Sequence, residues 1–522
     1  MSTIRLKTNQ HRLIANLRHA FNQASMLGEL LQNARRAQAN HIHITVDNDT
    51  LTVSDDGIGI ADLQTLIFIA ESGWDDELIV RENAFGLGVL STLYFAQHLS
   101  VHSVDQAFQA ETASIIRGSD VEVIPAPLRI GTQIRLNGVA SPQTGMNLPD
   151  WVRRELARLC EAFPVPVSLN GVAIARPLAD PSLKWRQTTM GQVLLSLSAP
   201  RTEWRCFLQG LPIGTRPRLN DHQVVLLRDN LIARPPDRQH LLNETEDNKR
   251  IQAAIDQAYR EALIEAKANL SGSEFVERHG SDCLRSSNAD LLNDVPFAQR
   301  SWFRNWADEP PGYRRFWERY LLGGIVAKEA LEEAGVWQVG EDATDEHAAH
   351  VYLEVREAFL LEEAYLDPGH WLSGMVKTIE PSRIVIKQGA ILHEDANLPL
   401  ADYPPLVLKL VDTLSVYLDG EPGVYTVETV RQGETLYLTS GADQVTRFVS
   451  DYIFNDRYDE NSEAEDAATI ATFIAVGRSP DPAGVVSALL PTSLRHSPLP
   501  RLAGATVCLV FDGEGRLQEV SS

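Results

Sequence analysis

Hydrophobic positions in the first part of the chain change their spacing near residue 40. Apolar residues recur at intervals of three and four between residues 11 and 39, which predicts a helix. They are Leu27, Leu30, Leu31, Ala34 and Ala37. Residues 41–46 and 51–53 instead alternate between polar and apolar, which predicts two strands joined by the turn DND. This hairpin would deliver the chain to Asp55.

The same reading continues to residue 270. A helix is predicted after the glycines of AFGLGVLS, and another in PDWVRRELARLCEAF, followed by a hairpin turned by Asn170-Gly171. Strands are predicted near 98–104, 110–117 and 131–137, then in GQVLLSLSA, EWRCFLQGLPI and HQVVLL. A long helix is predicted over about 247–269.

These elements predict an α+β chain of several domains. The proline-rich RPLADPS at 176–182 indicates a boundary, and the long helix would close a second α/β unit. We expect domains at 1–180 and 181–272, a helical segment at 273–345 and a mixed α/β region at 346–522. The acidic run DRYDENSEAED at 456–466 predicts a solvated loop. The stretch HED at 393–395 predicts a polar loop.

Composition narrows the classes of function. A chain of 522 residues exceeds what one core serves. A net charge of −23 disfavours binding to nucleic acid. No stretch is apolar enough for a signal peptide or a membrane span, so we expect a cytoplasmic protein without a membrane partner. Four cysteines without a CxxC pair argue against disulfides and zinc. They are Cys160, Cys206, Cys283 and Cys508.

Two polar residues share one face of the first predicted helix. Glu29 and Asn33 are four residues apart, so a carboxylate and a carboxamide project together. The carboxylate could activate a water molecule, and the carboxamide oxygen could bind Mg²⁺. Taken alone, a solvated helix face explains the pair better than a catalytic or metal site does. His41 and His43 are interpreted as exposed strand residues and not as metal ligands.

The stretch DDGIGI follows the predicted hairpin. Turn chemistry alone explains an Asp-Gly at a strand end. Asp55 could also accept a hydrogen bond from the amino group of a base, and Gly57 and Gly59 would let backbone approach a flat ligand. Gly86 and Gly88 precede a predicted helix, whose first N–H groups suit a phosphate.

The order of these motifs resembles that of the GHKL ATPase superfamily. ELLQNARRA, SDDGIGI, AFGLGVLS and GTQIRL look like its four boxes, in sequence order. Within the superfamily, IAESG, FGLGVLS and FNQASMLGELLQNA are most similar to the ninety-kilodalton heat-shock chaperones. The resemblance covers residues 10–175 and, more loosely, 185–270. It implies a GHKL (Bergerat) ATP-binding fold followed by a transducer-like domain.

The resemblance implies a role for each matched residue. Glu29 would be the general base, Asn33 the Mg²⁺ ligand, and Asp55 the acceptor for adenine, with Thr132 supporting Asp55 through a water molecule. Two pairs of glycines complete the site, lining the base pocket and placing backbone against the phosphates: Gly57, Gly59, Gly86 and Gly88.

The chain departs from the family at two places. Arg36 stands three residues after Asn33, where the family often has an acidic residue, so the groups around Asn33 differ from the family pattern. The segment WDDELIVREN is shorter than a chaperone lid. The transducer of the family commonly sends a cation to the γ-phosphate, and here Arg234 and Arg238 precede the long helix. Arg238 is the preferred candidate because it lies closer to that helix.

Two functions from different classes remain open. The first is an ATP-hydrolysing, chaperone-like clamp that acts on protein clients as a homodimer promoted by ATP. The second is a nucleic-acid clamp like those of the MORC and MutL proteins, acting in DNA processing or defence. A third alternative is an ATP-binding regulatory subunit without useful hydrolysis, which the presence of both Glu29 and Asn33 disfavours.

Overall fold

The alternating residues after position 40 form two antiparallel strands in the computed structural model of the chain, which describes residues 18–68, 90–234, 238–304, 306, 323–340, 346–401, 405–443, 445–454 and 457–522. The chain is mixed α/β with several sheets, consistent with an α+β class. It divides into two compact units, Met1–Asn269 and Leu270–Ser522. The finer division into four domains stays a prediction.

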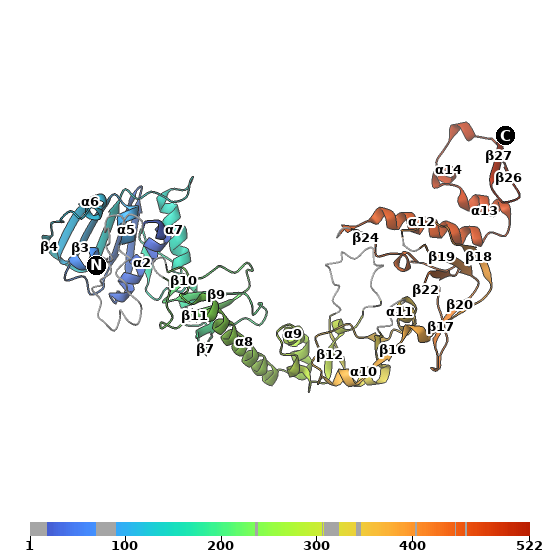
Figure 1. Cartoon of the computed structure of the whole chain (residues 1–522), viewed down its shortest axis with the longest axis horizontal. Coiled ribbons are helices and arrows are strands. Elements are labelled where there is room, and N and C mark those ends of the chain that lie inside the picture. Colours follow the sequence, from blue (N-terminus) through green and yellow to red (C-terminus); the bar gives the residue numbers. More distant parts are fainter. Residues whose placement is uncertain are drawn as a thin grey trace, which may run out of the picture. The chain divides into compact units, whose positions relative to one another are not determined.

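The first sheet of the N-terminal unit has six strands in the order β3-β4-β2-β1-β5-β6. Its strands β3 and β4 are labelled in Figure 1. The bounds of the strands in this sheet are β1 Ile42–Asp47, β2 Thr50–Asp55, β3 His98–Glu111, β4 Ile124–Asn137, β5 Val167–Leu169 and β6 Val172–Ala173. All neighbours pair antiparallel except β1 and β5, which are parallel. β2 therefore lies inside the sheet, with Asp55 at its end.

Helices cover one face of this sheet. They are α2 Gln23–Arg36, α3 Gln64–Ile67, α5 Leu90–Phe95, α6 Thr112–Ile116 and α7 Leu148–Leu159. Alternate residues of β1 are buried and exposed, so only one face of β1 is covered. The predicted apolar stripe of α2 packs into that core. Asn22 and Ser25 form a capping box that fixes where α2 begins.

A second sheet of five strands follows in the same unit, in the order β10-β9-β11-β8-β7. Its strands are β7 Trp185–Thr188, β8 Gly191–Leu194, β9 Trp204–Leu208, β10 Leu211–Ile213 and β11 Gln223–Leu227, and α8 Glu244–Asn269 packs on it. The predicted long helix is confirmed. The core between this sheet and α8 contains Val193, Val225 and Ile255.

The two sheets are joined through α2 and α7. The Nε2 atom of Gln32 donates to the carbonyl of Gln209 at 3.0 Å, in the turn between β9 and β10. A Cβ on Gly28 would lie 3.3 Å from Cδ1 of Leu211. Arg205 of β9 forms an ion pair with Glu161, just after α7. The helix that carries Glu29 is thus fixed against the second sheet.

The C-terminal unit contains several small sheets. Its helices are α9 Gly272–Arg285, α10 Lys328–Ala334, α11 His347–Glu354, α12 Glu460–Gly477, α13 Pro482–Leu489 and α14 Thr492–His496. Its strands begin with β12 Phe297–Gln299, β13 Ile325–Ala327, β14 Val336–Val339, β15 Phe359–Leu360, β16 Val376–Ile379, β17 Ile384–Gln388 and β18 Ile391–Asp395. They continue with β19 Val407–Val411, β20 Leu414–Leu418, β21 Tyr425–Thr426, β22 Thr429–Gln432, β23 Thr435–Leu438, β24 Ile453–Phe454, β25 Arg457–Tyr458, β26 Cys508–Phe511 and β27 Leu517–Ser521.

Three sequence predictions are wrong. The strand predicted at 110–117 ends at Glu111, where α6 begins. HED at 393–395 belongs to strand β18 and not to a loop. The acidic run is helical from Glu460, because tyrosine hydroxyls satisfy two acids that face inward: Tyr458 donates to Glu463 and Tyr452 donates to Asp466. Periodicity of apolar residues alone cannot detect such acids.

None of the described helices combines the length and apolar character that a membrane crossing needs.

Candidate functional site

Glu29 and Asn33 lie on α2 as predicted, on a face that the second sheet helps to cover. Glu29 is buried and Asn33 is half-buried. The side chain of Glu29 therefore does not lie on a solvated helix face. A buried carboxylate needs charged or hydrogen-bonding partners, because an isolated one costs several kcal/mol.

Glu29 has a guanidinium group beside each of its oxygens. The Nε atom of Arg238 lies 2.7 Å from Oε1, and the Nη1 atom of Arg36 lies 4.0 Å from Oε2. The exposed fraction of the side chain is 8% for Glu29, 19% for Arg238 and 2% for Arg36. Burial strengthens the attraction between these charges, so they form one electrostatic cluster.

Arg36 also contacts Asn33. Its Nη1 atom donates to Oδ1 of Asn33 at 3.3 Å. Because Arg36 follows Asn33 by three residues, both side chains lie on neighbouring positions of α2. Arg36, which replaces the acidic residue expected from the resemblance, thus lies between the predicted base Glu29 and the predicted metal ligand Asn33.

The candidate Mg²⁺ ligands do not fit the ion in this arrangement. Their oxygens are of the type that Mg²⁺ prefers. However, an ion at about 2.1 Å from Oδ1 of Asn33 would lie no more than about 5.4 Å from the Nη1 atom of Arg36, since that atom is 3.3 Å from Oδ1. At an effective dielectric constant of about 20, the repulsion is about 6 kcal/mol. Elsewhere in the described ranges, no three His, Cys, Asp or Glu side chains gather as metal ligands.

Arg238, and not Arg234, reaches Glu29. Arg234 is exposed, and its backbone N–H donates to the carbonyl of His240 at 2.7 Å. The backbone N–H of Arg238 donates to the carbonyl of Arg234, and Arg238 has φ of 54°. The loop that precedes α8 therefore turns Arg238 toward α2 and leaves Arg234 outside.

Asp55 is held by backbone N–H groups at the end of β2. Its Oδ1 atom accepts from Gly57 at 3.0 Å and from Thr132 at 3.3 Å. Burial raises the pKa of Asp55, although these two bonds and the charge of Arg129 lower it in part. Neither bond uses Oδ2, so that oxygen is the one a ligand could meet.

Thr132 supports Asp55 directly through its backbone N–H, and the expected support through a water molecule stays a prediction. Its hydroxyl lies 2.9 Å from the hydroxyl of Ser103. Ser103 is fully buried, donates to the carbonyl of Gly131 at 3.2 Å and accepts from the N–H of Ile60 at 2.7 Å. One hydroxyl thus joins the second predicted box to the fourth.

The sequence reasoning missed Ser103 and Gly131. A polar residue at an inward position of the alternating strand β3 was the available signal for Ser103. Gly131 has φ of 73°, and a Cβ there would lie 2.0 Å from the carbonyl oxygen of Asp55. Only glycine allows this approach of β4 to the end of β2.

The glycines of the second box also have internal neighbours. A Cβ on Gly57 would lie 2.5 Å from the carbonyl oxygen of Ala37, so α2 approaches this turn closely. Gly59 lies beside Ser103 and Val104. Gly86 and Gly88, predicted to place backbone against phosphates, lie outside the described residues.

The rings of His41 and His43 lie in contact but tilted, with their centroids 4.2 Å apart. His43 is exposed, as predicted, and its Nδ1 atom lies 2.9 Å from the hydroxyl of Ser168 on the neighbouring strand β5. No carboxylate or thiolate completes a metal set with them in the described part of the chain.

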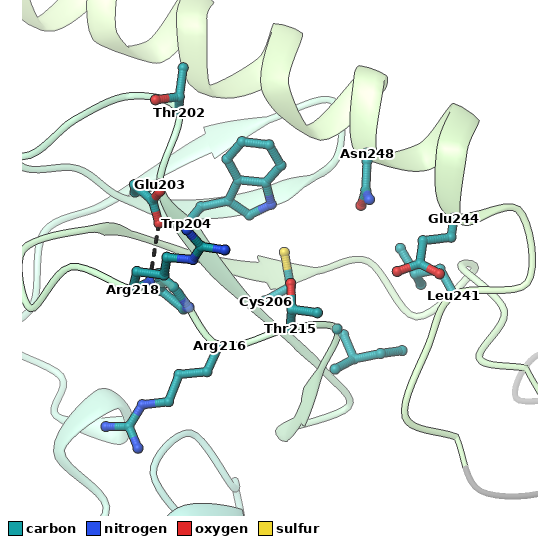
Figure 2. Close-up of a pocket in the computed structure, with 13 residues that line it drawn as sticks. Thr202, Glu203, Trp204, Cys206, Thr215, Arg216, Arg218, Leu241, Glu244 and Asn248 are labelled. Carbon is teal, nitrogen blue, oxygen red and sulfur yellow. Dashed lines mark hydrogen bonds between the residues drawn. The ribbon is translucent and has the colours of Figure 1, made fainter.

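A cleft of about 520 Å³ lies beside the second sheet. In Figure 2, Glu244 and Asn248 of α8 face Trp204 and Cys206 of β9 across it. The N–H of Gly214, which lines the cleft, donates to the carbonyl of Gln239 at 2.7 Å. The cleft is therefore linked to the residue that follows Arg238. No sequence pattern indicated it.

Comparisons with known proteins leave the family open. No protein-family model matches the sequence, and no curated protein matches it.

Proposed function

We propose that the N-terminal unit binds and hydrolyses ATP in the manner of a GHKL ATPase. The observation that carries the proposal is the approach of Arg238 to Glu29 at 2.7 Å. The resemblance implied a base in the first domain and a cation from the second, and these two side chains meet. The sheet with helices on one face supports assignment of a GHKL fold to residues 1–180.

Each residue has a role that follows from its contacts. Oδ2 of Asp55 would accept the adenine amino group, while Gly57 and Thr132 hold Oδ1. Glu29 would take a proton from the attacking water. Arg238 would leave Glu29 for the γ-phosphate, since a guanidinium group donates hydrogen bonds to phosphate oxygens in the same way as it donates them to carboxylate oxygens.

The proposed role in the cell is a cytoplasmic, chaperone-like clamp that acts on proteins as an ATP-promoted homodimer. The similarity of the motifs IAESG and FGLGVLS to those of the heat-shock chaperones supports this role, and so does the net charge of −23. The nucleic-acid clamp is the alternative, and DNA binding at low and physiological salt separates the two, since phosphate contacts weaken with salt.

Calorimetric titration with ATP, ADP and GTP tests the nucleotide site. We expect both adenine nucleotides to bind more tightly than GTP, because Asp55 accepts a hydrogen bond and the guanine carbonyl offers none. Asp55→Asn should abolish ATP binding. Near-normal ATP affinity in that variant would reject Asp55 as the adenine acceptor, and absence of binding to the wild type would reject the proposed function.

A further inference from the structure

Two guanidinium groups already lie beside Glu29 before any ligand binds. Glu29 contributes one negative charge, and Arg36 and Arg238 contribute one positive charge each. Sites that hold Mg²⁺ use carboxylates and substrate phosphates, so their protein groups are negative or neutral. Here, two cationic side chains lie beside the carboxylate.

Arg36 is the cationic residue that contacts the predicted metal ligand Asn33. Its side chain is 2% exposed, and it lies between Oε2 of Glu29 and Oδ1 of Asn33. A buried cation in this place cannot move into solvent to admit a second cation. It also turns the oxygen of Asn33 toward itself, which is the oxygen that a metal would use.

We propose that Arg238 meets the charge of the nucleotide phosphates, that Arg36 holds Glu29 and Asn33 in position, and that Asn33 does not hold Mg²⁺. This inference rests on the proposed ATP site. Arg238 is 19% exposed and would contact the phosphates itself. Arg36 is a positioning residue that acts through Glu29 and Asn33. ATP binding should consequently depend little on divalent cations.

The first experiment measures ATP affinity of the wild-type protein by calorimetry, in EDTA and in excess Mg²⁺. We expect the two dissociation constants to agree within about threefold. Binding that needs Mg²⁺, with a loss of about tenfold or more in EDTA, would overturn the inference and leave the ATP site intact. Absence of binding in both buffers would reject the ATP site and the inference together.

The second experiment removes the buried cation. Arg36→Met keeps an unbranched apolar side chain without the guanidinium charge and lets Asn33 face a metal. In this variant, we expect ATP affinity in EDTA to fall by about tenfold and Mg²⁺ to restore it. Arg35→Met is the control, because Arg35 is adjacent on α2 but donates to Gln32 at 2.6 Å, away from Glu29.

Mn²⁺ binding to the nucleotide-free proteins, followed by electron paramagnetic resonance, gives a readout that does not need ATP. Binding to Arg36→Met and not to the wild type supports the inference. Binding of Mn²⁺ to the wild type that Asn33→Ala removes would overturn it. If Arg36→Met does not fold, the two wild-type measurements decide.

Discussion

The Nε atom of Arg238 lies 2.7 Å from Oε1 of Glu29. The two residues come from different parts of the N-terminal unit, α2 and the loop before α8. While this ion pair exists, the proposed base is neutralised by the proposed phosphate sensor. A γ-phosphate that attracts Arg238 would free Glu29, so the pair makes activation of the base depend on ATP.

Replacing Arg238 should affect hydrolysis more than binding of ADP. In Arg238→Ala, no cation reaches the γ-phosphate, so we expect slower turnover, near-normal ADP affinity and loss of any ATP-dependent compaction in small-angle scattering. Removing one partner of a buried pair costs about 3–5 kcal/mol, and we expect less because Arg238 is partly exposed.

Arg234→Ala is the matched control for Arg238. Its side chain is exposed and its structural contact is made by the backbone, so stability and turnover should not change. Normal hydrolysis in both variants would remove the second sheet from the ATPase cycle. A loss in Arg234→Ala alone would move the sensor four residues upstream.

Glu29→Gln should separate binding from hydrolysis. Loss of a general base slows turnover by about 100-fold or more. Because the amide no longer competes with phosphate for Arg238, we also expect ATP affinity to rise above that of the wild type. Calorimetry and single-turnover hydrolysis measure the two effects. Unchanged turnover would remove Glu29 from the mechanism.

Asp55→Asn should change stability in a pH-dependent way. Burial raises the pKa of Asp55 in the folded protein, so its contribution to stability is present below the unfolded value of about 3.8 and is lost as pH rises through the folded pKa. An amide avoids this loss and can still accept from Gly57 and Thr132. We therefore expect the variant to unfold at a higher temperature than the wild type at neutral pH, with the difference vanishing in acid.

Asp56→Asn is the control of opposite sign. Backbone N–H groups of His41 and Asn40 lower the pKa of Asp56, so its ionised form stabilises the fold above the unfolded pKa. This variant should lose stability at neutral pH. Equal pH profiles for the two variants would contradict the assignment of Asp55 as the buried acid.

His370 should make the C-terminal unit sensitive to acid. Its Nδ1 atom accepts from the N–H of Leu372 at 3.1 Å, and Nε2 is buried without a hydrogen-bond partner. Burial lowers the pKa of His370 to about 4. The unfolded chain protonates near pH 6.5, so stability falls between pH 6.5 and 4, by at most about 1.4 kcal/mol per pH unit for one proton.

His370→Asn keeps an acceptor for the N–H of Leu372 and does not titrate. We expect its urea midpoint to depend less on pH between 6.5 and 4 than that of the wild type. His350, whose pKa burial also lowers to about 4, should retain the remaining dependence. His496→Asn at an exposed position is the control. Unchanged pH dependence in His370→Asn would show that His370 is protonated without cost.

The sequence predicted the parts of the site that depend on local spacing. Glu29 and Asn33 share a helix face because they are four residues apart, and Asp55 ends a strand because the alternation stops there. Ser103 and Gly131 were missed because their importance lies in contacts between strands that are distant in sequence. Arg36 was noticed only as a departure, although its spacing of three residues from Asn33 and seven from Glu29 places all three on one face of α2.

The C-terminal unit was harder to predict for a related reason. Glu463 and Asp466 look like solvated charges in sequence, but hydroxyl groups of Tyr458 and Tyr452 allow their burial in α12. Short strands such as β18 also offer too few residues for a clear alternation. Hydrogen-bond partners within and just before the acidic run decided the structure of α12.

The position of Gly131 against Asp55 restricts how this protein can evolve. Any side chain at position 131 would meet the carbonyl oxygen of Asp55 at about 2 Å and push the end of β2 away. A lineage that replaced the glycine would displace the acid at the same time, and no later substitution at position 55 alone could bring it back. Because the contact is with a backbone carbonyl, the need for glycine at position 131 does not depend on the side chain at position 55, whereas the position of the Asp55 carboxylate depends on Gly131.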